Sequence, residues 1–530
     1  MTLGIKGGMR TGFLWIEDWL DRAFGPAWNP LYHLGALGFF YYWIVAASGI
    51  YVYILFDTGT TEAYDSIEYM TVEQWYLGGV MRSLHRYASD GMVLMMVVHM
   101  LREFALDRYR GNRWFTWFTG VPVFWLVIAS GITGYWLVWD KLAQYLALAT
   151  TEWFDWLPIF GQPIARNFLA PSLLDDRFFT LLTFMHIAVP LILLLVLWIH
   201  LQRVSRSRIH PARGLALGTF AMLLALSLFK PAVSQGPADL ARVPAEVGLD
   251  WFYLAGYPLM DIWSKGALWA FTATLTLIVA VLPWLPPLRR VPAAVVDLKN
   301  CNGCTRCTED CPFNAVSMQP RTDGLPFEWE AAVNASHCVA CGICAGACPT
   351  STPFRRASDL VPGIDLPDRS LRQLRDQLEQ AAAALSGKAR VVVFGCDHGV
   401  APRDLALPGV AALSLPCIGA LPPSFIDYVL SRDLADGVFI TGCRKGECYQ
   451  RFGQRWTEDR LARRRDPYLR ARVPRERIGT FWAAPTNRRR LVQAVESFAA
   501  GLGAPPPAPG GPERPVGAPE ASTEEAAAHG

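Results

Sequence analysis

Cysteine is absent from the first 300 residues of this chain, and charged residues are scarce overall. All 12 cysteines lie at or after Cys301, and charged residues make up only 18% of the 530 positions. Disulfide-stabilised exported proteins do not confine their cysteines to one half of the chain in this way. The net charge of +3, without a basic block containing aromatics, gives no support for nucleic acid as a partner, and none is expected.

Several short motifs are also missing. Residues 1–30 contain no continuous apolar run, so we expect no cleavable signal. The absence of C-x-x-C-H excludes covalently attached haem, and no Rieske-type Cys/His pair is found. The chain has no G-x-G-x-x-G either, so a separate flavoprotein, dehydrogenase or hydrogenase subunit is expected to exchange electrons with it.

What the chain does contain is long apolar runs, which give a mean hydropathy of +0.21. They predict an all-α transmembrane bundle of six helices, each near the roughly 20 residues that a bilayer requires. The predicted spans are 34–56, 78–101, 115–139, 178–202, 214–232 and 265–285. Before them, apolar Trp15, Ile16, Trp19 and Leu20 alternate with acidic Glu17, Asp18 and Asp21. This pattern predicts an amphipathic helix on the membrane surface, although an ordinary soluble helix fits it as well.

Basic residues are unevenly distributed among the loops. Residues 102–113 and 203–213 each contain four arginines, whereas 57–77 contains five acidic residues and no lysine or arginine. The positive-inside rule therefore places both termini and the two basic loops in the cytoplasm. We expect a multi-pass protein of the cytoplasmic (inner) membrane of a prokaryote, in contact with membrane lipid.

Four pairs of residues in separate predicted spans share a spacing of 14. They are Gly35 and Gly49, His85 and His99, Gly120 and Gly134, and His186 and His200. Fourteen residues rise about 21 Å along a helix and return to nearly the same face. Because the second and fourth spans run parallel, His85 pairs with His186 and His99 with His200. The pairs predict two bis-histidine haem b groups, for which the glycines leave room.

A lone histidine in an apolar span is more often a hydrogen-bonded core residue, but two equally spaced pairs favour metal ligation. Arg82 and Arg102 each lie one turn from a predicted ligand. They would bind haem propionates or act as interfacial arginines, and both interpretations stay open.

These residues resemble cytochrome b of the quinol-oxidising respiratory and photosynthetic complexes over residues 10–285. Gly134-Tyr135, Arg177-Phe178-Phe179 and Pro190 add to the resemblance, and the last two helices of that family are absent. Where the family has Pro-Glu-Trp-Tyr at its outer quinol site, this chain has Leu249, Asp250, Trp251 and Phe252. The resemblance implies a quinone site with Asp250 and Trp251 as catalytic residues, whereas a helix N-cap is the alternative role for Asp250.

The inner quinone site of that family is less well matched. Ser205 stands where the family has a histidine, and Arg213 and Gly214 stand where it has an acidic residue. His210 could replace the histidine, but it lies in a basic loop. We therefore expect the inner haem to exchange electrons with the cytoplasmic half of the chain.

The cytoplasmic half begins with two copies of C-x2-C-x2-C-x3-C-P, the bacterial pattern for two [4Fe–4S] clusters. In this pattern the fourth cysteine of each motif ligates the other cluster. One predicted ligand set is Cys301, Cys304, Cys307 and Cys348, and the other is Cys338, Cys341, Cys344 and Cys311. The doubled motif disfavours zinc, and a small α+β ferredoxin domain is expected.

Three strand-like runs further on end in Cys396, Cys417 and Cys443, and Cys448 follows closely. Alternating strands and helices predict an α/β parallel sheet, at whose carboxyl edge these cysteines would converge. Four thiolates suit one [2Fe–2S] cluster, with zinc or free thiols as alternatives. The residues resemble the delta subunit of methyl-viologen-reducing hydrogenases, although Gly399 occupies a position where that family would have another cysteine.

The predicted domains follow from these boundaries. They are 1–30 surface helix, 31–232 haem bundle, 233–290 quinone-site-like loop and sixth span, 291–354 ferredoxin domain, 355–388 linker, 389–500 delta-like domain and 501–530 disordered tail. The expected function is that of an oxidoreductase, the membrane electron-transfer subunit of a quinone oxidoreductase. It would pass electrons from the third cluster through the two cubes and two haems to quinone, or in the reverse direction. A redox relay without quinone chemistry is the alternative, and a high-potential acceptor outside and a dimeric assembly stay open.

Overall fold

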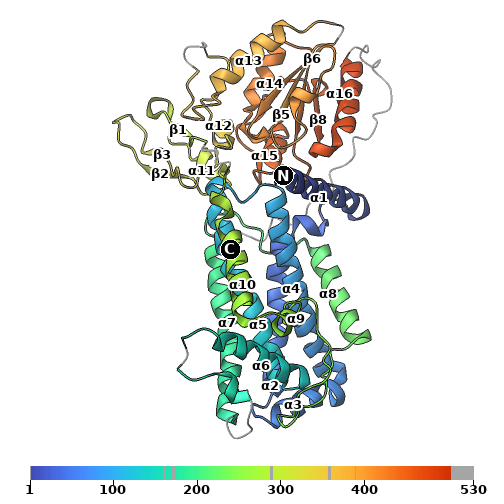
Figure 1. The fold of residues 1–530 in the computed structure, drawn as a ribbon. Coiled ribbons are helices and arrows are strands. Elements are labelled where there is room, and N and C mark those ends of the chain that lie inside the picture. Colours follow the sequence, from blue (N-terminus) through green and yellow to red (C-terminus); the bar gives the residue numbers. More distant parts are fainter. Residues whose placement is uncertain are drawn as a thin grey trace.

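The computed structural model contains a helical bundle joined to a part that carries the β-strands, residues 291–502, which we call the soluble part (Figure 1). It describes residues 2–159, 161–168, 174–286, 291–355, 360–387 and 389–502. Helix α1 (Thr2–Phe24) lies at the junction between the two parts. Most of the tail predicted from residue 501 lies outside the described residues.

The bundle helices follow the six predicted spans. They are α2 (Leu34–Leu55), α4 (Val80–Ala105), α5 (Trp114–Val138), α7 (Asp176–Leu201), α8 (Arg213–Phe229) and α10 (Lys265–Val281). Within the part of the chain that the structure describes, four helical stretches could cross a membrane by length and composition: 34–55, 111–138, 179–201 and 265–284. Helix α4 fails this criterion because it carries Arg82, Arg86 and Asp90, and α8 fails because it has only 17 residues.

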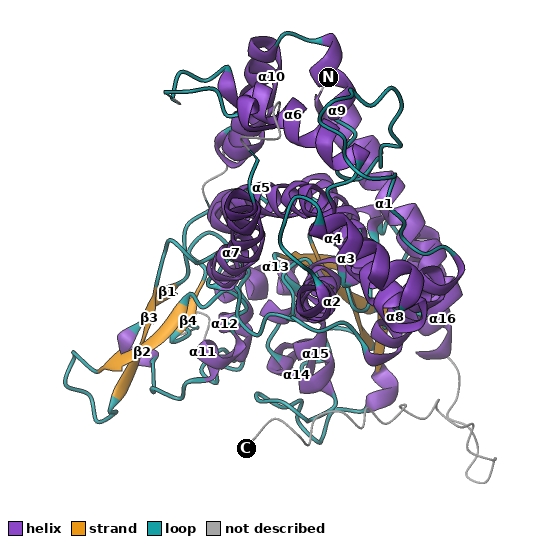
Figure 2. Ribbon diagram, turned by 90° about the horizontal axis from the view of Figure 1, so that it is seen from below, coloured by secondary structure: helices purple, strands orange, loops and turns teal. Residues whose placement is uncertain are grey.

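Helix pairing sets the positions of the histidines. Helix α4 packs along α2 and α5 packs along α7, while α8 covers α4 and α10 covers α5. The view along the bundle shows these helices side by side (Figure 2). Gly91 of α4 allows close contact with α2, because a Cβ there would lie 2.7 Å from the Tyr41 ring.

The end of the bundle farthest from the soluble part contains helices that the sequence analysis did not predict. They are α3 (Glu62–Glu68), the π-helical turns η2 (Tyr69–Glu73) and η3 (Trp75–Gly79), α6 (Lys141–Asp155), η5 (Ala165–Phe168) and α9 (Tyr257–Ile262). The third span ends where Trp139 adopts the left-handed conformation, with φ of 51°. Asp140 then caps α6 by accepting a hydrogen bond from the Ala143 N–H at 2.9 Å.

The ferredoxin domain has two small antiparallel sheets. Strand β1 (Val295–Val296) pairs with β4 (Ile364–Asp365), and β2 (Val316–Pro320) pairs with β3 (Trp329–Val333). Helices α11 (Arg306–Asp310) and α12 (Ile343–Ala347) follow the first cysteines of the two motifs. Because β4 belongs to the predicted linker, the ferredoxin domain extends beyond residue 354.

The last domain is an α/β structure with a parallel sheet, as predicted. Among the described residues its strand order is β6 (Val410–Leu415), β5 (Val391–Cys396), β7 (Gly437–Gly442) and β8 (Ile478–Trp482). The associated helices are α13 (Leu371–Ala383), α14 (Pro423–Ser431), α15 (Gly453–Leu461) and α16 (Arg488–Leu502). Strand β8 was not predicted, and α13 from the predicted linker packs beside β6.

Short 3-10 turns connect these elements. They are η1 (Pro30–Tyr32), η4 (Gly111–Arg113), η6 (Leu282–Trp284), η7 (Leu298–Asn300), η9 (Pro402–Asp404), η10 (Ile418–Ala420), η11 (Arg475–Arg477) and η12 (Pro485–Asn487). Of these, η4 and η10 lie where the domains meet.

Candidate electron-transfer sites

The structure brings His85 and His186 together between α4 and α7. Their ring centroids lie 6.3 Å apart. A metal–imidazole bond is about 2.0 Å long, and the ring centre lies roughly 1 Å beyond the nitrogen. Two rings on opposite sides of one metal ion therefore have centroids about 6 Å apart. The two rings are therefore spaced as ligands on opposite sides of one metal ion. We call them the outer pair.

His99 and His200 form the corresponding inner pair, close enough for their charges to interact. Each lies 14 residues beyond its outer counterpart on the same helix, so the two pairs are about 21 Å apart. The pairing of 85 with 186 and of 99 with 200 is thus the one that the structure favours.

Three of the four predicted glycines lie against these histidines. A Cβ on Gly49 would lie 2.9 Å from His85 Cε1, and one on Gly134 would lie 2.9 Å from His186 Cε1. A Cβ on Gly120 would lie 3.6 Å from His200 Cε1, whereas one on Gly35 would meet no atom within 4 Å. A larger side chain at Gly49 or Gly134 would therefore displace a ligand ring.

Hydroxyl groups beside the glycines orient the rings, and the sequence analysis missed them. Thr133 Oγ1 lies 3.1 Å from His186 Nδ1, and Thr119 Oγ1 lies 3.0 Å from His200 Nδ1. His85 Nδ1 lies 2.9 Å from the Val45 carbonyl oxygen. Such bonds fix the ring and leave Nε2 for the metal. The sequence did contain a signal for these hydroxyl groups, because a serine or threonine directly precedes three of the four glycines.

Arg82 and Arg102, the candidate propionate ligands, both have protein partners. Arg82 hydrogen-bonds Thr71 and donates to Ser234 Oγ at 2.7 Å, so it joins α4 to the outer loops. Arg102 lies 2.7 Å from carboxylate oxygens of both Glu17 and Glu447. The side chain of Arg102 is therefore committed to α1 and the last domain, which disfavours the propionate role.

The ferredoxin cysteines form the two predicted sets. Cys301, Cys304, Cys307 and Cys348 line one cavity, which we call the first ferredoxin site. Burial, and then the thiols of Cys304, Cys348 and Cys301, raise the pKa of Cys307 to about 12. In the second ferredoxin site, burial and the neighbouring thiols of Cys341, Cys338 and Cys311 raise the pKa of Cys344. Each set therefore draws three cysteines from one motif and one from the other.

Cys396, Cys417, Cys443 and Cys448 converge at the carboxyl edge of the parallel sheet. We call this group the third cysteine site. Cys396 Sγ lies 3.6 Å from Cys443 Sγ, and the thiol of Cys417 bonds that of Cys448. A Cβ on Gly453 would lie 2.0 Å from Cys417 Sγ, so the helix start is shaped around the thiols. The thiol of Cys448 also bonds that of Cys443, so the four thiols form one connected group. Four converging thiols suit a [2Fe–2S] cluster.

Two further features of the third cysteine site bear on the alternatives. Among the described residues, no three His, Cys, Asp or Glu side chains are arranged to hold a single metal ion. At Gly399, a Cβ would lie 2.9 Å from the Gly442 carbonyl carbon, so no cysteine fits there. Burial lowers the pKa of His398 to about 4, and its ring stacks on Tyr449 with centroids 3.6 Å apart.

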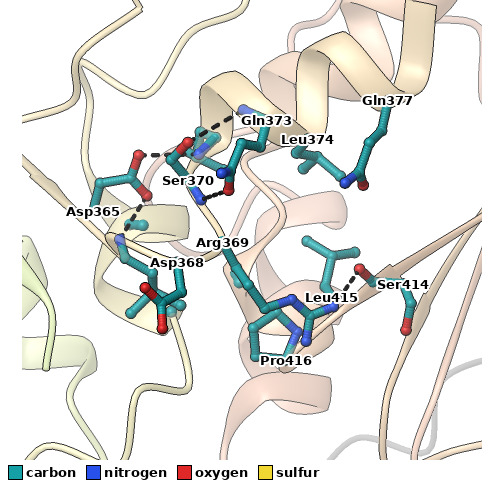
Figure 3. Close-up of a pocket in the computed structure, with 15 residues that line it drawn as sticks. Asp365, Asp368, Arg369, Ser370, Gln373, Leu374, Gln377, Ser414, Leu415 and Pro416 are labelled. Carbon is teal, nitrogen blue, oxygen red and sulfur yellow. Dashed lines mark hydrogen bonds between the residues drawn. The ribbon is translucent and has the colours of Figure 1, made fainter. Parts of the chain in front are cut away.

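A small pocket lies where the ferredoxin domain, α13 and the parallel sheet meet (Figure 3). Several of its polar groups already have partners. Ser370 and Gln373 form a capping box at the start of α13, and Arg369 donates to the Ser414 carbonyl oxygen at 2.8 Å. This pocket belongs to the domain interface, and we assign no ligand to it.

Arg460 joins the two soluble domains beside their cysteines. It is 1% exposed and donates to Asp310 Oδ2 at 2.6 Å and to the Gly419 carbonyl oxygen at 2.8 Å. Asp310 directly precedes Cys311, and Gly419 follows Cys417 by two residues. The second ferredoxin site and the third cysteine site are therefore held in one body.

Replacing Arg460 with methionine is expected to lower the free energy of unfolding by about 3 kcal/mol, because a buried ion pair loses one partner. Denaturant unfolding of the detergent-solubilised protein measures this change. The control is Arg464→Met, since Arg464 pairs with Asp459 on the surface and should change stability by less than about 0.5 kcal/mol. Equal losses in the two variants would contradict the structural role of Arg460.

Asp250 lies in a polar cluster at the outer end of the bundle. Arg86 donates to Asp250 Oδ2 at 2.8 Å, and Tyr135 bonds the same oxygen. Asp250 Oδ1 accepts a hydrogen bond from the Phe252 N–H at 2.6 Å. The carboxylate thus caps a turn and also faces the bundle, whereas Trp251 is 75% exposed and points away from the core.

The comparisons with known families match the chain in three separate parts. Residues 20–207 match the family Cytochrome b/b6/petB, residues 300–352 match the 4Fe-4S dicluster domain, and residues 391–504 match the delta subunit of methyl-viologen-reducing hydrogenase. The predicted fusion of three redox domains is confirmed. The first match contains all four histidines but ends before α8, α10 and the loop with Asp250.

One solved structure, titled "Hyperthermophilic respiratory Complex III", is similar at 20% sequence identity and a TM-score of 0.41. The similarity covers 49% of this chain and 77% of that chain, and it is too weak to support a functional conclusion. The family matches and the apolar helices support a multi-pass membrane protein that acts as an electron-transfer subunit of the oxidoreductase type.

Proposed function

We propose that this chain passes electrons between a cytoplasmic low-potential partner and the membrane quinone pool. The observation that carries the proposal is the packing of three cysteine sites onto the end of a bundle with two stacked histidine pairs. When bound, two b haems, two [4Fe–4S] clusters and one [2Fe–2S] cluster would each accept and release single electrons. The paired histidines and the three cysteine sites would hold these groups.

The soluble part and the loop after α1 cover the positions of the family's inner quinone site. The Ser205 N–H donates to the Pro312 carbonyl oxygen at 3.2 Å, which places the second ferredoxin site beside the loop after His200. A Cβ on Gly214 would lie 2.7 Å from the Trp28 ring. These contacts support direct exchange between the inner pair and the cysteine sites, without an inner quinone.

The outer end offers a proton acceptor for quinol oxidation. Arg86 pairs with both Asp250 and Asp90, so two carboxylates share one guanidinium and the trio is left with a negative charge. Such a group can take up one proton, which belongs to the carboxylate pair and not to one member. We propose that quinone binds beside this cluster, next to Tyr135 and the outer pair.

The variant Asp250→Asn is expected to slow quinol-dependent haem reduction about 100-fold, the typical loss for a general base. Asparagine keeps the oxygen that accepts from the Phe252 N–H, so the turn is preserved while the charge is lost. Stopped-flow absorbance of the b haems with a reduced quinone measures the rate. Asp261→Asn is the matched control, because Asp261 is exposed and accepts a hydrogen bond from the Tyr145 hydroxyl. An unchanged rate in Asp250→Asn would remove Asp250 from the reaction.

Both carboxylate oxygens of Asp250 already have partners, Arg86 and a backbone N–H. This observation favours the second candidate function, a relay without quinone chemistry. Such a relay would dock a cytoplasmic hydrogenase-like or heterodisulfide-reductase-like enzyme to the membrane. Addition of quinol under anaerobic conditions distinguishes the two functions, since a relay would show no quinol-dependent haem reduction. We propose a cytoplasmic membrane location with the soluble part inside, as the basic loops indicate.

A further inference from the structure

The segment that carries the last two cysteines of the third site, 443–451, contacts the membrane part of the chain. The Tyr449 hydroxyl donates to the Asp107 carbonyl oxygen at 2.8 Å. Arg113 donates to the Tyr449 carbonyl oxygen at 2.9 Å. Arg451 donates to the Arg206 carbonyl oxygen at 3.2 Å. Both basic cytoplasmic loops are therefore used to bind this segment.

Buried ion pairs strengthen the same contact. Glu447, the residue before Cys448, lies 2.7 Å from Arg102 and 2.8 Å from Arg108. Arg102 lies one turn beyond His99 on α4. A single ion pair, Glu447 with Arg102, thus connects the backbone next to Cys448 to α4, the helix that carries His99.

Helix α1 completes this contact from the other side. Glu17 is 2% exposed and pairs with Arg102 at 2.7 Å, and Arg444 lies 3.3 Å from Asp21. The apolar residues Trp15 and Trp19 of α1 remain exposed, at 70% and 57%. The acidic face of the amphipathic helix therefore binds the 443–451 segment, and its apolar face is left for the membrane surface.

The first ferredoxin site lies away from this contact. Of the 12 cysteines, Cys301 and Cys304 are the two that are not buried. The second ferredoxin site approaches the membrane part through Asn112, which bonds the Cys338 carbonyl oxygen. Cys341 of the second site packs in the same buried cluster as the four cysteines of the third site, so the second and third sites are neighbours.

We propose that the third cysteine site is the junction with the inner histidine pair, and that the first ferredoxin site is the end open to the cytoplasmic partner. This order rests on the proposed electron-transfer function and reverses the one expected from the sequence, in which the third site receives electrons first. Glu447, Arg102 and Glu17 are positioning residues in this arrangement. The partner is then a one-electron donor or acceptor protein that reaches the exposed edge at Cys301 and Cys304.

Electron paramagnetic resonance of the full-length holoprotein tests the order of the sites. With the clusters reduced and the inner haem oxidised, the haem should speed the spin relaxation of the third-site signal and leave the first-site signal nearly unchanged. The variant His200→Leu, which lacks the inner haem, should lose the effect, and Cys304→Ser identifies the first-site signal. Faster relaxation of a signal from either ferredoxin site than of the third-site signal would overturn the order. Absence of quinol-dependent haem reduction would contradict the proposed quinone function but not the proposed order of the sites, which the relaxation measurement tests separately.

The variant Glu447→Gln tests the positioning residues in the same measurement. It should weaken the relaxation effect on the third-site signal and shift the midpoint potential of the inner haem, with both iron and haem retained. Glu447→Asp, which keeps the charge, should restore part of the effect. Glu476→Gln is the control, because Glu476 is exposed on the same domain. If Glu447→Gln behaves like that control, the ion pairs do not position the third site.

Discussion

The protein with His186 replaced by leucine is expected to bind one b haem in place of two. Leucine fills similar space but cannot ligate iron, so the outer pair is lost while the inner pair keeps both ligands. The pyridine haemochrome assay gives the haem content per chain, and redox titration should show one midpoint potential fewer. The retained haem should be the one assigned to His99 and His200.

The control for this prediction is His210→Leu. His210 is exposed in a basic loop and lies outside both pairs, so this variant should keep two haems. Two haems in His186→Leu would contradict the ligand assignment. Loss of both haems would show that the pairs do not form independently.

Periodic and local signals made the cofactor sites predictable. His85 and His186 meet because equal spacing on parallel helices repeats at each level, and helix geometry alone fixes that relation. The cysteines of the ferredoxin domain follow a short motif whose crossed ligation is a property of the motif. Cys396, Cys417 and Cys443 end consecutive parallel strands, so the sheet brings them to one edge.

The contacts between domains could not be predicted in the same way. Arg102 and Glu447 are separated by more than 300 positions, and no periodic pattern links them. A charged residue at a helix end is compatible with a propionate, a lipid headgroup or another domain, and only the fold decides among them. Strand β8 was missed because it has only 5 residues. Helix α6 has 15 residues but was missed because its apolar residues are interrupted by polar ones and form no continuous apolar run.

Gly453 shows a further kind of residue that sequence alone does not reveal. It begins α15, where glycine is a poor helix former and has no evident local purpose. In the structure its α-carbon faces Cys417 Sγ, which a Cβ would approach to 2.0 Å. Helix α15 can pass this close to the third cysteine site only with glycine at this position.

The variant Gly453→Ala is therefore expected to lose the cluster of the third cysteine site while keeping both haems and both ferredoxin sites. The added methyl group must displace Cys417 Sγ, and one of four ligands would leave its position. Iron analysis should fall by the content of one [2Fe–2S] cluster, and the matching paramagnetic signal should disappear. Gly501→Ala is the control, because a Cβ there meets no atom within 4 Å and alanine favours the helix. A full third-site signal in Gly453→Ala would mean that Cys417 is not a ligand, since the other three cysteines do not contact Gly453 as closely.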